Sequence, residues 1–241
     1  MPLVTVLGAK GGCGASLIAT NLALALTRYG GTLLVDLHIG DGGDDLLLDL
    51  SPERSWADLL PVAGELTERH LELAIRTHSS GLSLLAGPAG APDAESEQRL
   101  IALLQALAGQ FEWTVLDSPS SSPMLSSWLT LSDVIALVAT ADPPALRAAQ
   151  RRLASLPSGD RARVRLVLNQ FTRAHPAHPS SVAASLECPL LAVFPTDPRA
   201  VGFQINFGRP CVLDPQSGFG RSAAAMAKTM AAKRSAGKAA A

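Results

Sequence analysis

The chain has 241 residues and a formal net charge of −1. This length suits a single α/β domain whose core is large enough to fold alone. The near-neutral charge gives no electrostatic indication of a nucleic-acid or acidic-lipid partner. Three scattered cysteines argue against a disulfide framework, and no uncharged apolar run approaches the roughly 20 residues that span a bilayer. We therefore expect a cytoplasmic protein.

Residues 3–16 read as a short apolar strand, a glycine-rich loop and the start of a helix. Such a loop can hold phosphate, because glycines let consecutive backbone N–H groups turn inward. The helix N-terminus adds a partial positive charge at the same place. This stretch predicts a phosphate-binding loop, although a glycine turn without a ligand is the alternative.

The loop departs from the usual P-loop pattern G-x-x-x-x-G-K-[ST] at two positions. Aligned on Gly14, the chain has Ala9 in place of the first glycine and Ala15 in place of the lysine. It keeps Ser16, the position of a magnesium ligand. A different lysine, Lys10, stands at the front of the loop.

A strand–helix–strand unit follows the loop, as expected around a P-loop. The predicted helix covers residues 17–28, and the apolar strand at residues 32–36 ends in the carboxylate of Asp36. The next segment, residues 37–45, is a polar, glycine-rich loop that contains His38. It lies at the carboxyl end of a strand, where doubly wound sheets bind their ligands.

The middle of the chain predicts a second strand that ends in a carboxylate. The strand at residues 112–117 is mainly apolar and ends in Asp117, followed by Ser-Pro, which is the layout of a Walker B strand. Its carboxylate can hold magnesium through water. Two short helices, a strand and a longer helix are expected between the two carboxylates, at residues 55–60, 67–74, 81–86 and 94–108.

The last third continues the strand and helix alternation. We expect a helix that is capped by Asp142 and exposes three arginines. A solvated helix face is the favoured interpretation of these arginines, and a DNA contact is the alternative. An alanine-rich helix at residues 219–234 has too small an apolar face for membrane anchoring. The remaining expected strands cover residues 133–139, 164–169 and 189–194, and the three arginines are Arg147, Arg151 and Arg152.

The loop residues 10–16 resemble the deviant Walker A motif K-G-G-x-G-K-[ST] of the MinD/ParA family, with its P-loop lysine missing. This resemblance implies a doubly wound, mostly parallel α/β sheet of the P-loop NTPase type. It also implies ATP and Mg²⁺ as cofactors, and a homodimer in which Lys10 of one subunit reaches the nucleotide of the other. A single domain at residues 1–234 is expected, followed by a disordered tail at residues 235–241.

The resemblance also assigns roles to individual residues. Asn169 ends a strand at the position where the family has an asparagine that hydrogen-bonds the edge of the adenine base. Pro195 and Asp197 match the segment that lies beside the adenine in the family. Ser16, Asp36 and Asp117 are the expected magnesium ligands. Lys10, Asp36 and His38 are only weak candidates for catalysis. The nucleotide-binding residues carried over are Lys10, Gly11, Gly12, Cys13, Gly14, Ala15, Ser16, Asn169, Pro195 and Asp197.

Residues 35–50, 55–60 and 80–88 are more narrowly similar to the CpaE/TadZ branch of this family, which serves Flp/Tad pilus assembly. This similarity implies pilus or secretion proteins as partners and recruitment to a membrane-bound machine or a cell pole. In active relatives the position of His38 holds an aspartate that orients the attacking water. An imidazole there accepts a proton near neutral pH, but a solvent-facing loop histidine without a catalytic role is the favoured interpretation.

The absence of the P-loop lysine determines how well we expect the chain to bind and hydrolyse a nucleotide. Removing one partner of a buried charge pair costs about 2–5 kcal/mol, so nucleotide binding should be weakened and hydrolysis negligible or very slow. Three hypotheses stay open at this point. The chain is a nucleotide-responsive scaffold, an active positioning ATPase in which Lys10 and His38 replace the missing groups, or an interaction module without nucleotide.

Overall fold

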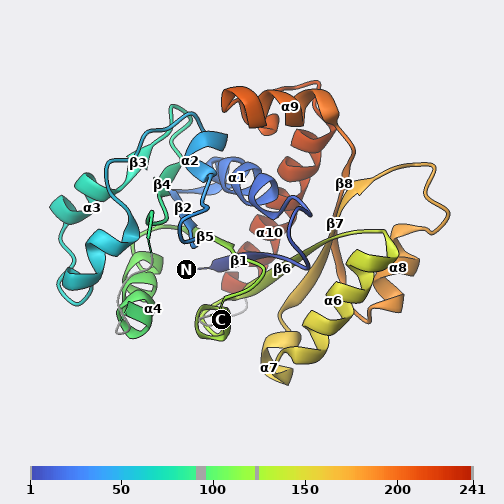
Figure 1. Ribbon diagram of the computed structural model, residues 1–241, viewed down its shortest axis with the longest axis horizontal. Helices are drawn as coiled ribbons and strands as arrows, with labels where there is room; N and C mark the ends of the chain where they lie inside the picture. Colours follow the sequence, from blue (N-terminus) through green and yellow to red (C-terminus); the bar gives the residue numbers. More distant parts are fainter. Residues whose placement is uncertain (1, 91–95, 123–124, 240–241) are drawn as a thin grey trace.

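The fold is built on one eight-stranded sheet with helices on both of its faces (Figure 1). The computed structural model describes residues 2–90, 96–122 and 125–239. The strand order is β3-β4-β2-β5-β1-β6-β7-β8. Neighbouring strands run parallel except for the antiparallel pair β3–β4, so the predicted doubly wound, mostly parallel sheet is confirmed. The strands are β1 (Leu3–Gly8), β2 (Thr32–Asp36), β3 (Arg76–Thr77), β4 (Ser83–Leu85), β5 (Trp113–Ser118), β6 (Val134–Thr140), β7 (Val164–Phe171) and β8 (Leu190–Pro195).

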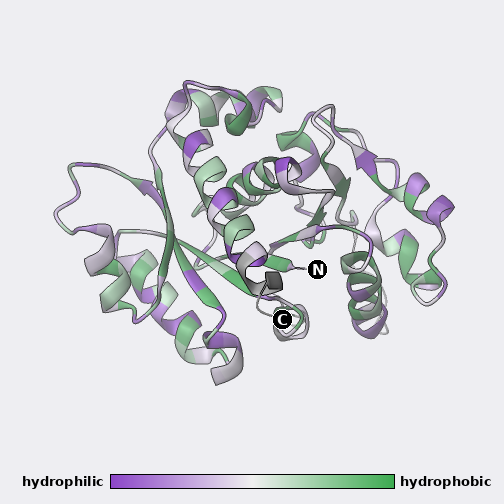
Figure 2. Ribbon diagram, turned by 180° about the vertical axis from the view of Figure 1, so that it is seen from behind, coloured by the Kyte–Doolittle hydropathy of each residue, from purple (hydrophilic) through white to green (hydrophobic). Residues whose placement is uncertain are grey.

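Two apolar cores lie on opposite faces of the sheet, because successive side chains of a strand alternate between its faces. On β1, Val4 and Val6 pack in the core under α1 (Ala15–Leu26) and α10 (Gly218–Ala239). Leu3 and Leu7 pack in the other core, which α4 (Ser96–Ala108), α6 (Pro143–Ser155) and α8 (Pro179–Ser185) cover. The strands between these layers are mostly hydrophobic in Figure 2, as expected for a sheet buried on both faces.

Side chains cap the starts of several helices, and one of these caps, Asp142, is predicted from the sequence. The Asp142 carboxylate accepts a hydrogen bond from the N–H of Ala145 at 3.0 Å, and Thr67 accepts one from His70 at 3.4 Å. The other helical segments are α2 (Asp44–Leu47), α3 (Glu68–Ala74), α5 (Leu125–Leu129), α7 (Ser158–Arg161), α9 (Pro198–Phe207) and the 3₁₀ turns Thr27–Tyr29, Trp56–Val62 and Cys211–Leu213.

The apolar side chains of the C-terminal helix pack inside the protein. Phe219, Met226 and Met230 are buried in the core beside α1 and β8. Residues 235–239, expected to be disordered, continue the helix in this alanine-rich sequence. Residues 240–241 lie outside the described part of the chain. Among the helices that the structure describes, none is both long and apolar enough to cross a membrane.

Candidate functional site

The glycine-rich loop joins the end of β1 to the start of α1. Gly12 and Gly14 adopt left-handed φ values of 76° and 86°, which residues with a Cβ rarely adopt. Gly14 is also the N-cap of α1 and, as a glycine, offers no side chain to cap the first turn of the helix. A helix N-terminus that opens from a glycine-rich loop in this way is the arrangement that binds anions.

A hollow of about 210 Å³ lies against this loop. Every predicted loop residue from Lys10 to Ser16 lines it, together with His38, Ser118 and Ser120. Cofactor pockets usually measure roughly 300–1,000 Å³, so this space suits phosphate groups rather than a whole nucleotide. Lys10 stands exposed at its rim, and its charge helps to hold the pKa of Asp142 below the usual range, after hydrogen bonds from Thr140 and Ala145.

Cys13 takes part in the loop through its backbone, because its side chain points into the core. The residue is 2% exposed, and a Cβ on Gly8 would lie 2.9 Å from its Sγ atom. Burial raises the pKa of the Cys13 thiol, although N–H groups of Lys10 and Ala15 act in the opposite direction. The thiol is therefore neutral and faces away from the hollow.

The two strand-end carboxylates come together as the sequence predicts. Strands β2 and β5 are parallel neighbours, and Asp36 stands opposite Asp117 in their register. Both side chains are buried, at 3% and 1% exposure. The indole N–H of Trp56 donates to the carbonyl oxygen of Asp36 at 2.9 Å, which fixes the end of β2.

His38 lies between these carboxylates. Its Nδ1 atom is 2.8 Å from Asp36 Oδ1 and 3.4 Å from Asp117 Oδ2. Burial alone would lower the pKa of His38, but its hydrogen bond with Asp36 and the charge of Asp117 together raise it. The expectation of a solvent-facing loop histidine is wrong, because β2 delivers the residue directly into a buried acidic cluster.

The pKa of Asp117 is raised to about 7. Burial and the charge of Asp36 raise it, whereas the charge of His38 and the hydrogen bond with the Ser16 hydroxyl lower it. Its Oδ1 atom has no hydrogen-bond partner among the described residues. A buried carboxylate oxygen without a donor is costly, so this atom is suited to a cation.

Asp44 is a third buried carboxylate, which the sequence did not single out. It begins α2 and is fully buried, and neither of its carboxylate oxygens has a partner in the described part of the chain. Burial and the charges of Asp117 and Asp36 raise its pKa well above the usual range. Its backbone N–H lies 3.5 Å from Asp36 Oδ2. The only sequence signal was one aspartate among several in a polar loop.

Asn169 reaches the loop from the end of β7, and both polar atoms of its side-chain amide already form hydrogen bonds within the protein. Its Nδ2 donates to the carbonyl oxygen of Cys13 at 2.8 Å, and its Oδ1 accepts from the N–H of Gln170 at 2.8 Å. The residue is 3% exposed. In the structure it supports the loop, and its predicted contact with an adenine stays a prediction.

Pro195 and Asp197 do not line the hollow beside the glycine loop. Pro195 ends β8, and the Asp197 side chain accepts hydrogen bonds from Ala200 N at 3.2 Å and from Ser217 Oγ at 2.7 Å. Asp197 thus caps α9 and ties it to the start of α10. Their predicted adenine-side role is untested by this geometry.

The three arginines of α6 do not share one solvated face. Arg147 and Arg151 are exposed, whereas Arg152 is half-buried and donates to the carbonyl oxygen of Ser120. Burial lowers the pKa of Arg152, and its Nε has no partner within the described residues. The expectation of three exposed arginines is therefore wrong for Arg152, which holds the segment after Asp117.

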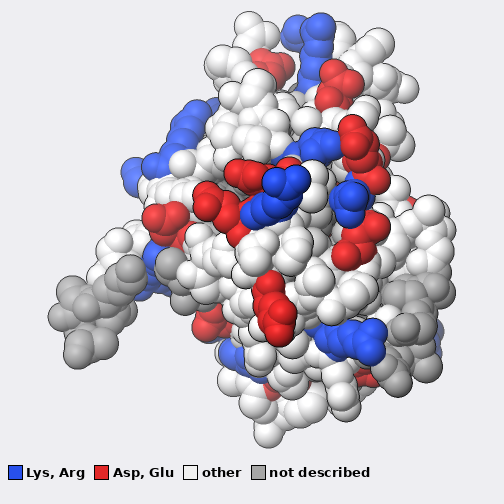
Figure 3. Space-filling view, turned by 90° about the vertical axis from the view of Figure 1, so that its left-hand side faces the viewer, with Lys and Arg blue, Asp and Glu red and all other residues white. Residues whose placement is uncertain are grey.

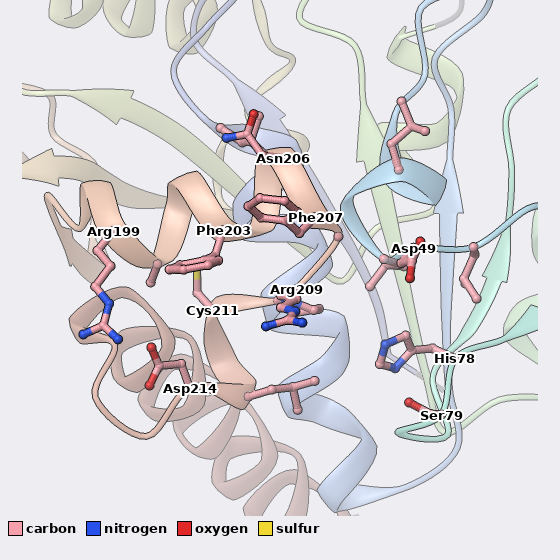
Figure 4. Close-up of a pocket in the computed structure, with 18 of the residues that line it drawn as sticks. Asp49, His78, Ser79, Arg199, Phe203, Asn206, Phe207, Arg209, Cys211 and Asp214 are labelled. Carbon is pink, nitrogen blue, oxygen red and sulfur yellow. The ribbon is translucent and has the colours of Figure 1, made fainter.

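A larger groove of about 1340 Å³ lies on another part of the surface, beside α9 (Figure 4). Phe203 and Phe207 project from α9, with ring centroids 5.7 Å apart. They are 43% and 62% exposed. Arg209 lies next to them in the close-up, with Asp49 and His78 on the opposite wall. Although this groove is larger, it is not the phosphate site, because the glycine loop, Asp36 and Asp117 do not line it.

A glycine loop between β1 and α1, flanked by Asp36 and Asp117 at adjacent strand ends, defines a P-loop protein of the MinD/ParA type. More particularly, the chain belongs to the family described as cellulose biosynthesis protein BcsQ, whose model matches residues 1–178. The Ala15 and His38 departures lie within the matched segment. The narrower CpaE/TadZ assignment is not shown by this match.

Similar proteins agree with this class. A putative septum site-determining protein MinD of Guillardia theta is 27% identical over 222 residues, which cover 88% of this chain and 81% of the relative. A ParA family ATPase from Chlorobium tepidum TLS superposes with a TM-score of 0.83 at 22% identity, covering 94% of this chain and 98% of that one. MinD from Pyrococcus horikoshii OT3, solved with Mg-ADP, gives 0.74 at 22% identity and covers 95% of both chains. The two structural likenesses concern the fold.

Proposed function

We propose that this chain binds a magnesium–nucleoside triphosphate at the glycine loop and uses binding, rather than rapid hydrolysis, to control its assembly with partners. The observation that carries this proposal is Ala15. A loop with the backbone geometry of a phosphate cradle has a methyl group where the cation that stabilises phosphoryl transfer normally stands.

The residues present fit the proposed ligands. The unpartnered Oδ1 of Asp117 and the adjacent Ser16 hydroxyl are oxygen ligands of the kind that Mg²⁺ prefers. The loop N–H groups and the α1 N-terminus would take the phosphates. Magnesium, when bound, would neutralise phosphate charge, and the loop backbone would orient the phosphates. The Mg-ADP complex of the Pyrococcus horikoshii protein, which shares the fold, supports this choice of ligand.

Slow hydrolysis follows from two side chains. A lost buried charge partner costs about 2–5 kcal/mol. His38 stands where a carboxylate would orient water, and its raised pKa favours the imidazolium, which cannot accept a proton. Both changes raise the barrier to hydrolysis, so we expect bound nucleotide to be exchanged faster than it is hydrolysed.

Nucleotide binding and phosphate release test the proposal directly. Ala15→Lys should tighten binding of a fluorescent ATP analogue at least about tenfold, because it restores a point charge at the phosphates. Gly159→Lys is the control, since Gly159 is exposed, has open space around its Cα and lies outside the loop. Rapid phosphate release by the wild type that Asp117→Ala abolishes would contradict slow hydrolysis. Absence of binding in both the wild type and Ala15→Lys would contradict a nucleotide site.

Self-association through Lys10 is part of the same proposal. Lys10 stands exposed at the rim of the hollow, as a residue that reaches a partner's nucleotide would. ATP within an interface turns binding energy into dimerisation energy. Lys10→Ala should abolish an ATP-dependent monomer-to-dimer shift in sedimentation, while Lys228→Ala should leave it intact. If ATP does not shift the wild-type chain from monomer to dimer, the nucleotide-linked interface is excluded and a constitutive scaffold is the remaining interpretation.

The family description favours a cellulose-synthesising machine as the place of action. The pilus-assembly alternative is supported by the similarity of residues 35–50, 55–60 and 80–88 to the CpaE/TadZ branch. Positive and negative side chains are interspersed on the face in Figure 3, which does not favour a nucleic-acid partner. Deleting the gene should lower Congo red binding by cellulose and leave piliation unchanged. The reverse result assigns the chain to a pilus.

A further inference from the structure

The acidic cluster behind the glycine loop has more buried charge than its protein neighbours neutralise. Asp36, Asp44 and Asp117 are each at most 3% exposed, and they arrive from the end of β2, the start of α2 and the end of β5. His38 is the one cationic side chain within ion-pair distance of Asp36 or Asp117 in the described chain. Buried carboxylates are normally paired or bound to a cation.

The hydrogen bonds within the cluster leave specific atoms unsatisfied. Both carboxylate oxygens of Asp36 have hydrogen-bond donors. Oδ1 accepts a hydrogen bond from His38 N at 3.0 Å, and Oδ2 accepts one from Gly43 N at 3.1 Å. By contrast, both oxygens of Asp44 and Oδ1 of Asp117 have no donor among the described residues. These atoms belong to side chains that are almost completely buried, so bulk water does not satisfy them.

We propose that His38, Asp36 and Asp117 bind one divalent transition-metal ion directly, in the absence of nucleotide. One ligand atom from each residue lies within 4.8 Å of the others. Asp44 adds negative charge beside this site. The inference does not depend on nucleotide binding, because all the ligand atoms belong to the protein.

The observed separations match a metal's first coordination shell. Bonds of about 2.1 Å place neighbouring ligand atoms roughly 3.0 Å apart in octahedral geometry and roughly 3.4 Å apart in tetrahedral geometry. His38 Nδ1 is 2.8 Å from Asp36 Oδ1 and 3.4 Å from Asp117 Oδ2. The Asp36 and Asp117 oxygens lie within 4.8 Å of each other, so side-chain rotation that brings them closer would place an ion between the three atoms.

The imidazole selects the kind of ion. Nitrogen ligands suit Zn²⁺, Co²⁺ and related transition metals, whereas Mg²⁺ prefers oxygen ligands and keeps several waters. A magnesium ion that arrives with a nucleotide needs none of this imidazole chemistry. His38 therefore gives the cluster a preference for a transition metal that an aspartate at the same position would not give.

The test uses the full chain, freed of metal by a chelator that is then removed, without nucleotide. Titration with Co²⁺ should give visible d–d absorption that saturates at one ion per chain, and Zn²⁺ should displace it. A large excess of Mg²⁺ should not. His38→Ala should weaken Co²⁺ binding at least about tenfold. His78→Ala is the control, because His78 bonds Ser80 outside the cluster.

A second variant separates ligand loss from misfolding. His38→Asp supplies a carboxylate of similar reach and should shift the preference from Zn²⁺ toward Mg²⁺, measured by competition. Circular dichroism establishes that each variant is folded. The inference is overturned if the wild type binds neither Co²⁺ nor Zn²⁺ without nucleotide, or if both His38 variants bind Zn²⁺ as the wild type does. Either result leaves the nucleotide proposal standing.

Discussion

The side-chain amide of Asn169 donates a 2.8 Å hydrogen bond to the carbonyl oxygen of Cys13, which links the end of β7 to the glycine loop. A Cβ at Gly14 would lie 2.3 Å from the same amide nitrogen. The loop is thus held in one conformation by a buried side chain that approaches it closely. Its phosphate-binding shape depends on this contact as well as on its glycines.

Asn169→Ala should destabilise the fold and loosen the loop. The change leaves the Cys13 carbonyl and the Gln170 N–H without the partners that Asn169 supplies, which costs about 1–3 kcal/mol. Urea unfolding measures the loss, and nucleotide titration measures the effect on the loop. Asn206→Ala is the control, because Asn206 is exposed and bonds only its own helix at Gly202. Equal stability of the two variants would contradict the role of Asn169.

Gly14→Ala should be far more damaging than Gly11→Ala. At Gly14 an added methyl group meets Asn169 and a φ of 86°, whereas at Gly11 nothing lies within 4 Å and φ is not in the left-handed region. We expect a loss of about 2 kcal/mol or more for Gly14→Ala and less than about 0.5 kcal/mol for Gly11→Ala. Thermal unfolding of the two variants checks this difference, and similar melting temperatures would refute it.

The sequence predicted the parts of the site that depend on local rules. Asp36 and Asp117 meet because each ends an apolar strand, and carboxyl ends of parallel strands share one sheet edge. The burial of Asp44 and of Arg152 was not predicted. It depends on how α2 packs against α1 and α9 and how α6 packs against β6. A polar loop or an arginine-rich helix does not show this packing in its own sequence pattern.

The metal-free protein should become more stable as the pH falls from about 7.5 to about 5.5. The pKa of Asp117 is raised to about 7 in the fold, so the folded state binds a proton that the unfolded state releases. The raised pKa of His38 acts in the same direction. Each pKa unit corresponds to about 1.4 kcal/mol, which gives a gain on the order of 2 kcal/mol.

Urea unfolding in a chelating buffer at several pH values measures this slope. Asp117→Asn removes the titrating carboxylate and should flatten the slope, while Glu65→Gln, which changes an exposed carboxylate outside the cluster, should not. An increase in wild-type stability with rising pH over this range would show that the cluster is satisfied in its charged form. Saturating Zn²⁺ should reverse the slope if the cluster binds it, because a cation favours the ionised carboxylates.

A second buried network, which the sequence gives no means to predict, joins α1 to α9. Gln204 Oε1 accepts from Asn21 Nδ2 at 2.7 Å and from Cys211 N at 3.1 Å, and its Nε2 donates to Thr20 Oγ1 at 3.1 Å. Gln204 and Asn21 are fully buried although 183 residues separate them. Nothing local in either helix distinguishes them from exposed amides.

Gln204→Leu should therefore cost about 3 kcal/mol of unfolding free energy, because it leaves buried groups of Asn21, Thr20 and Cys211 without this partner. Gln216→Leu is the matched control, since Gln216 is exposed and accepts only a 3.4 Å hydrogen bond from Arg199. Urea unfolding compares the two variants. Because α1 begins at the glycine loop, the Gln204 variant should also show faster amide exchange in the first turn of α1. A Gln204→Leu protein as stable as Gln216→Leu would mean that apolar packing replaces the network without loss.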